Sequence, residues 1–162
     1  MDNSINMYFN KMTELVSAKK QLLTEMLKLT NAQTPVIKEG SLDELQKLIE
    51  EKQKLIDQID KLDIGFSNYL EQLKAATGVS KLEEIDVSRY PGAIQLKQAT
   101  AEVLEIVREI SGIEKVNSEK SKELLKQLGS QIQRINQGRK INNAYSKPKP
   151  AGTPSFFMDK KG

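Results

Sequence analysis

Apolar side chains recur at steps of three, four and seven residues along most of this chain, which is the spacing of amphipathic helices. The first such stretch covers about residues 3–31. The segment 31–40 then contains Pro35, which biases Thr34 away from helical geometry, and it ends in Gly40. The pattern therefore predicts a first helix that ends before this segment. Its predicted core positions are Ile5, Tyr8, Met12, Leu15, Leu22, Met26 and Leu29.

Two more long helices follow from the same spacing. A capping-box sequence, Ser41 to Glu44, opens a predicted helix over about residues 41–76. A short helix is predicted over about 81–86, and a third long helix over about 91–137, with Pro91 in its first turn. The apolar stripe of this third helix has two parts, which are Val103, Ile106, Val107, Ile110 and Ile113, and then Leu124, Leu125, Leu128, Ile132 and Ile135.

These elements predict an all-α protein. We expect an elongated antiparallel bundle of three long helices, with a short extra helix and a mobile C-terminal tail. The bundle is predicted to occupy residues 1–141 and the tail residues 142–162. Prolines alternate with lysines in this tail, which favours an extended, solvated chain rather than a helix.

The predicted helix lengths differ in a way that concerns function. At 1.5 Å per residue the three helices would be about 44, 54 and 70 Å long. The third helix therefore runs about 11 residues past its neighbour, roughly over 127–137, and this overhang carries Leu128, Ile132 and Ile135. An uncovered apolar stripe usually marks an interaction site. A bound partner, a weak homodimer and a bend that folds the helix back all remain open explanations.

Composition argues against catalysis. The chain of 162 residues has no Cys and no His, which removes thiol nucleophiles and the commonest general base and metal ligand. The nine glycines form neither a dinucleotide fingerprint nor a phosphate-binding loop. The sequence therefore predicts no enzyme, no metal site and no cofactor.

Charge and hydropathy limit the classes of partner. The chain from Arg134 onward is +6 and the remainder −3, for a net charge of +3. Phe156 and Phe157 lie far in sequence from Arg139 and Lys140, and the negative remainder would repel phosphate, so we expect no nucleic-acid binding. No apolar run approaches the roughly 20 residues that span a bilayer, and the start resembles no signal peptide. A protein of the cytoplasm, with no direct membrane insertion, is predicted.

The order of the segments resembles that of a known family. A first helix is followed by KEGSLDELQKLIEEKQKLIDQIDKLD, by a long helix with Asn117 in its polar interruption, and by an end that carries Tyr145 and SFFMDKKG. This succession resembles the FlgN family of flagellar export chaperones over essentially the whole chain. The resemblance implies a protein that binds the C-terminal helices of the hook–filament junction proteins, hook-associated proteins 1 and 3. It also implies that the protein prevents their premature assembly and delivers them to the flagellar type III export gate.

The resemblance also assigns expected roles to residues. Tyr145 matches a position associated with docking on the cytoplasmic domain of the export-gate membrane protein. The tail residues themselves, rather than the resemblance, lead to the expectation that Phe156, Phe157 and Met158 either close over the apolar stripe or add contacts to a client, and a tail without function stays open. A structural coiled coil that self-associates without any client is the alternative function. The predicted client-binding residues are Leu124, Leu125, Leu128, Ile132, Ile135 and Ile141.

Overall fold

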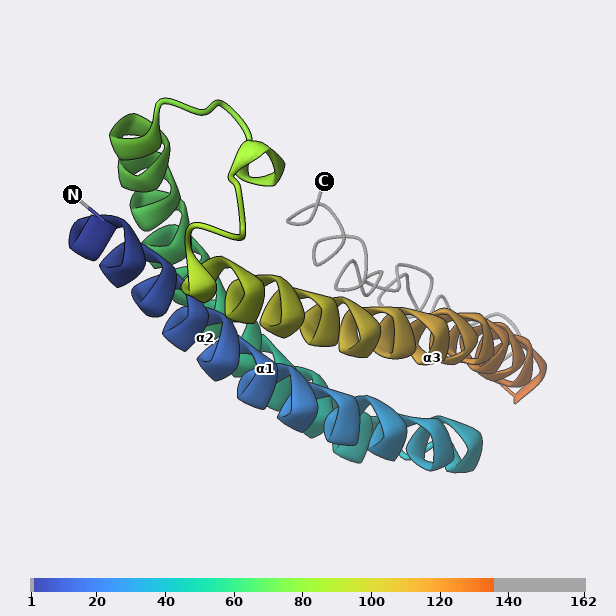
Figure 1. Cartoon of the computed structure of the whole chain (residues 1–162). Helices are drawn as coiled ribbons and strands as arrows, with labels where there is room; N and C mark the ends of the chain where they lie inside the picture. Colours follow the sequence, from blue (N-terminus) through green and yellow to red (C-terminus); the bar gives the residue numbers. More distant parts are fainter. Residues whose placement is uncertain (1, 136–162) are drawn as a thin grey trace. The chain divides into compact units, whose positions relative to one another are not determined.

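The part of the chain that the computed structural model describes, residues 2–135, is built from helices and contains no strand (Figure 1). Side chains are described from residue 4 to residue 133. None of these helices has an apolar run long enough to cross a bilayer. The predicted all-α class with three long helices is confirmed. The elements are α1 (Asp2–Glu39), α2 (Leu42–Thr77), the short 3-10 helix η1 (Leu82–Glu84) and α3 (Pro91–Ile135).

Contacts divide the chain into two units, and each long helix contributes to both. Unit 1 comprises Met1–Leu27 and Lys52–Glu109, and unit 2 comprises Lys28–Glu51 and the chain from Ile110 onward. The predicted boundary at residue 141 between bundle and tail lies outside the described residues and stays a prediction.

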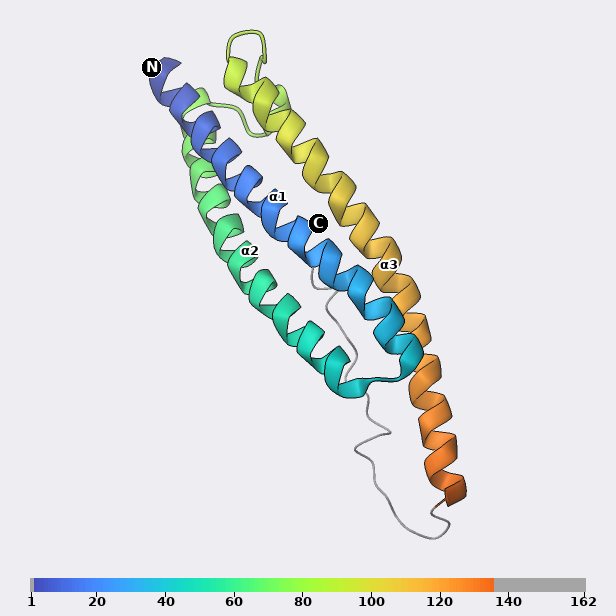
Figure 2. The same cartoon turned by 90° about the horizontal axis from the view of Figure 1, so that it is seen from below.

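In unit 1, α1 contacts both of the other long helices (Figure 2). Toward α2, Tyr8 pairs with Tyr69, while Lys19 lies 2.7 Å from Asp63, so the two helices are antiparallel. Toward α3, Phe9 packs on Tyr90, and Lys20 lies 2.7 Å from Glu102. From the first of these contacts to the second, the residue number increases on both helices, so α1 and α3 are parallel. In this unit α2 is therefore antiparallel to both α1 and α3, as the predicted antiparallel bundle requires.

The core face of α1 is wider than the predicted stripe because the helix packs against two partners. Leu15 approaches Gly65 of α2, and Phe9 lies against Gly92 of α3. As a result, Phe9, Val16 and Leu23 are buried, and they alternate with predicted positions that are only half-buried. The predicted residues Ile5, Met12 and Met26 are buried, whereas Tyr8, Leu15, Leu22 and Leu29 are half-buried.

The prediction that the first helix ends before the segment 31–40 is wrong. The first helix does not end near residue 31 but continues through Pro35 to Glu39. Gly40 then closes it in a Schellman motif, with φ of 73° and backbone bonds from Gly40 N to Ile37 O and from Ser41 N to Val36 O. An interior proline removes one helix hydrogen bond and costs about 3 kcal/mol. Burial of Ile37, which is 3% exposed, offsets part of that cost.

The other predicted boundaries agree with the structure to within a few residues. The helix predicted over 41–76 is α2, and Gly78 follows its end, with its amide bonded to Lys74 O. The short helix predicted over 81–86 is the three-residue η1. Pro91 begins α3, as predicted. The predicted end of the third helix at residue 137 lies outside the described residues.

Unit 1 buries a lysine, and this makes its stability depend on pH. Lys52 on α2 is 2% exposed, and burial lowers the pKa of its ammonium from 10.5 to about 8. Between these two pH values the unfolded chain binds more protons than the folded one. The free energy of unfolding therefore rises with pH across this window, by an amount on the order of 3 kcal/mol.

We expect this rise to be specific to Lys52. Urea unfolding at pH 7.5 and at pH 10.5, followed by circular dichroism, should show a larger gain in the wild-type chain than in Lys52→Met. The comparison removes every contribution that is the same in both proteins. Equal gains in the two proteins would contradict the assigned pKa.

Candidate functional site

The end of α3 continues past the turn that joins α1 to α2. A Cβ atom added to Gly40 in this turn would lie 3.7 Å from Leu124 Cδ1, so Leu124 marks where the turn meets α3. Within unit 2, α3 runs parallel to α1 and continues to Ile135, about 16 Å further on (Figure 2). This segment is the predicted overhang, and it begins close to the predicted position.

The apolar stripe on this segment is narrow and has polar flanks. Leu124, Leu125, Leu128 and Ile132 are half-buried, and Leu124, Leu128 and Ile132 have the i, i+4 and i+8 spacing of one helix face. Lys126, Gln127, Ser130 and Gln131 beside them are exposed. A stripe of this form suits an amphipathic helix laid along it, with anchors one turn apart.

Only part of the predicted site can be compared with the structure. Ile135 is the last residue of α3, and its side chain lies outside the described residues. The predicted client residue Ile141, the predicted docking residue Tyr145 and the predicted tail contacts Phe156, Phe157 and Met158 also lie outside them. Their roles stay predictions.

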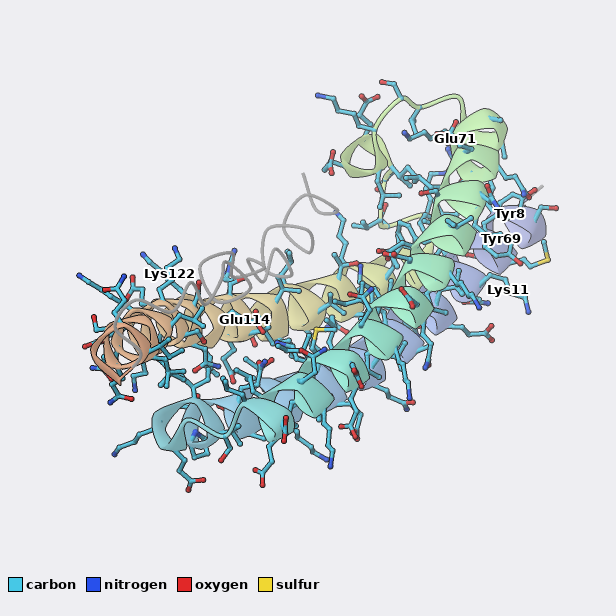
Figure 3. The ribbon with its side chains drawn as sticks, turned by 180° about the vertical axis from the view of Figure 1, so that it is seen from behind. Tyr8, Lys11, Tyr69, Glu71, Glu114 and Lys122 are labelled. Atoms are coloured by element: carbon cyan, nitrogen blue, oxygen red, sulfur yellow. The ribbon has the colours of Figure 1, made fainter. Side chains whose placement is uncertain are left out.

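A buried polar cluster joins α1 to α3 in unit 2, which sequence reasoning missed. The Thr34 hydroxyl donates to Asn117 Oδ1 at 2.7 Å, and Asn117 Nδ2 donates to the Thr30 carbonyl at 3.0 Å. The Thr30 hydroxyl donates to Glu114 Oε1 at 3.4 Å. Thr30, Asn117 and Glu114 are 0%, 5% and 7% exposed, and Figure 3 labels Glu114 on α3. We name Thr30, Thr34, Glu114 and Asn117 the polar cluster.

A sequence signal for this cluster exists. Asn117 lies seven residues after Ile110 and seven before Leu124, and Glu114 lies seven after Val107. These two polar residues therefore occupy core positions of the same stripe that the apolar residues follow. The polar composition of residues 117–123 predicted an interruption of the stripe, although Asn117 itself stands at a heptad position.

The site offers apolar side chains for packing and polar groups for hydrogen bonding. Among residues 2–135, no three His, Cys, Asp or Glu side chains come together as a metal site would require. The apolar stripe lies on α3, and two members of the polar cluster, Glu114 and Asn117, precede it on the same helix. This arrangement fits recognition of another helix.

Comparison with known proteins addresses the identity of the chain. The profile of the FlgN family, described as FlgN protein, matches residues 7–152, which is most of the chain. Neither the curated proteins nor the solved structures include a match. The family is one of chaperones rather than of enzymes, and it implies a general role in flagellar export. On this match, and in agreement with the three-helix fold, the chain belongs to the FlgN family.

Proposed function

We propose that this protein is a cytoplasmic export chaperone for the hook–filament junction proteins, hook-associated proteins 1 and 3. It binds their C-terminal helices on the stripe Leu124–Ile132 of α3 and so prevents their premature assembly. It then delivers them to the flagellar type III export gate. Family membership supports the chaperone role, and the continuation of α3 past the Gly40 turn is the observation that carries the binding site.

Physical chemistry favours this segment as the client site. A chaperone for a polymerising subunit has to cover the helix through which that subunit assembles, and it must later release it. Leu124, Leu128 and Ile132 offer anchors at successive turns, each contributing about 1.5–3 kcal/mol when fully buried. A few such anchors give a complex that is specific and still reversible, since ordering both partners offsets part of this gain.

The proposal is tested by light scattering after size-exclusion chromatography. The full chain is run alone and mixed with hook-associated protein 1 or 3 from the same cells. A 1:1 complex, formed from a monomer or a weak dimer, is the expected result. A stable homo-oligomer that does not bind either junction protein would refute the proposal and favour the structural coiled coil.

Delivery to the export gate is proposed to use Tyr145. The Tyr145→Ala variant should bind the junction protein as the wild type does, because Tyr145 lies outside the proposed stripe. It should lose binding to the purified cytoplasmic domain of the export-gate protein, measured by pull-down of the client-loaded complex. The Tyr145→Phe variant is the control that keeps the ring and removes only its hydroxyl. Unchanged gate binding by the Ala variant would remove Tyr145 from the proposal.

A further inference from the structure

We infer that the client-binding surface of α3 extends beneath the end of α1, from Leu124 back to Ile110, and that this end of α1 detaches to expose it. The inference rests on the proposed function, because it assigns a longer contact surface to the same client helix. Three features of unit 2 support it. They are the helical turn of α1 that contains Pro35, the polar cluster, and the apolar stripe of α3.

The end of α1 is intrinsically weak as a helix. Pro35 has no amide hydrogen, so the carbonyl of Asn31 loses its partner in the helix, and the residue before a proline disfavours helical geometry. Taken alone, this sequence would end the helix before Pro35. In the folded chain the helix nevertheless continues to Glu39.

Asn117 of α3 forms hydrogen bonds to the turn of α1 that leads to Pro35. Its side chain donates to the carbonyl of Thr30, next to Asn31, and accepts from the hydroxyl of Thr34, next to Pro35. One amide thus bonds to two residues of α1 that lie one turn apart, and both of them precede Pro35. The helical state of residues 31–39 therefore depends on contact with α3 rather than on local propensity.

The interior beneath this segment is mostly polar. Among the described residues of unit 2, Ile37 and Ile110 are the only apolar side chains that are fully buried, and the remaining buried ones are Thr30, Gln33, Glu114 and Asn117. Hydrogen bonds that are exchanged for equivalent bonds change the free energy little, whereas buried apolar area resists opening. The end of α1 is therefore the part of that helix that separates from α3 most readily.

Detachment would lengthen the stripe without changing its direction. Ile110, Ile113 and Leu124 follow the same face as Leu128 and Ile132. Asn117 and Glu114 would be exposed in the middle of this longer surface. Leaving them unpaired under a client would cost about 1–3 kcal/mol each.

The occupant is thus an amphipathic helix of defined chemistry. Its apolar stripe has to be interrupted by Ser, Thr, Asn or Gln at the positions that meet Asn117 and Glu114. Such side chains would replace the bonds that Thr30 and Thr34 make in the free chain. A purely apolar helix would not replace these bonds, so it should bind less tightly.

Hydrogen exchange of the full chain, read by mass spectrometry, tests the detachment. In the free protein, amides in residues 34–39 should exchange at least about 100-fold faster than those in residues 9–26 of the same helix. Asn117→Ala should raise the exchange of residues 34–39 by about tenfold or more and leave residues 9–26 unchanged. Uniform exchange along α1 would overturn the inference.

The complex provides the second test. When the junction protein is bound, residues 34–39 should exchange still faster, while residues 110–132 become protected. Increased protection of residues 34–39 on binding would overturn the inference and leave the proposed function intact. Absence of any complex would refute the proposed function, and the inference with it, whatever the exchange of the free chain.

A substitution of Pro35 distinguishes detachment of the end of α1 from a general loss of folding. Pro35→Ala restores the missing helix bond, so it should slow client association by about tenfold, with little change in dissociation. The matched control is Pro91→Ala at the first position of α3 in unit 1, which should leave the association rate unchanged. Equal association rates for wild type and Pro35→Ala would overturn the inference.

Discussion

The double variant Leu128→Asp, Ile132→Asp is expected to bind the junction protein at least about 100-fold more weakly than the wild type, a loss of about 2.7 kcal/mol or more. Both residues are half-buried on the face proposed to receive the client helix. Each substitution removes an apolar anchor and places a carboxylate in a desolvated interface, where an unpaired charge is costly. Titration calorimetry with the intact junction protein measures the change.

The control for this variant lies on the same turns of α3. Gln127→Asp, Gln131→Asp introduces the same two charges one residue earlier, at exposed positions. We expect its affinity to stay within about twofold of the wild type, because rim charges alter binding little. Circular dichroism should show equal helix content in both variants. Wild-type affinity of the Leu128, Ile132 variant would remove this stripe from the proposed site.

The predicted long helices were recovered where local signals and packing agree. The N-terminal turn of α3 has Pro91, a residue that favours the first helical position, and Gly78 stands directly after α2. Ile110 and Val107, predicted from their spacing, are buried. In each case the sequence contains both the periodic apolar residues of the helix and the residue at which the helix begins or after which it ends.

The end of α1 shows why local signals can fail. Pro35 and Gly40 were interpreted together as a loop, yet Gly40 alone ends the helix, and Pro35 lies inside it. Asn117, which is more than 80 residues away, bonds to Thr30 and Thr34 in the turn that leads to Pro35. A contact over this distance in sequence cannot be derived from propensity.

The candidate site was predicted only in part, because some of its features also depend on contacts between residues far apart in the sequence. The stripe through Leu128 and Ile132 follows from helical spacing, and its position past the start of α2 follows from helix lengths. Glu114 and Asn117 were missed because polar side chains in a helix are usually solvated. Their burial becomes apparent only when α1 supplies Thr30 as a hydrogen-bonding partner.

The apolar interior of the described chain belongs mainly to unit 1. All of its fully buried apolar side chains except Ile37 and Ile110 lie there. Unit 2 instead buries the polar cluster, whose net contribution to stability is small per hydrogen bond. A client site next to a weakly stabilised interior requires a second part of the chain that stays folded during binding. Unit 1 has the composition for that role.

The Phe9→Ala variant should therefore lower the free energy of unfolding by about 3–5 kcal/mol. Phe9 is 1% exposed, and its ring centroid lies 6.0 Å from that of Tyr90. A Cβ added to Gly92 would approach Phe9 Cβ to 2.9 Å, so the backbone of α3 fits closely against this side chain. Such close packing leaves little room for collapse, so truncation should leave a cavity in addition to removing buried apolar surface.

The matched control is Met7→Ala, two residues away on the same helix. Met7 is 48% exposed, so its truncation should change the free energy of unfolding by less than about 0.5 kcal/mol. Urea unfolding of the wild type and both variants, followed by circular dichroism, measures the two changes under one condition. A cost below about 1 kcal/mol for Phe9→Ala would mean that unit 1 repacks freely at this point. Unit 1 could not then serve as the part of the chain that stays folded while the end of α1 detaches from α3.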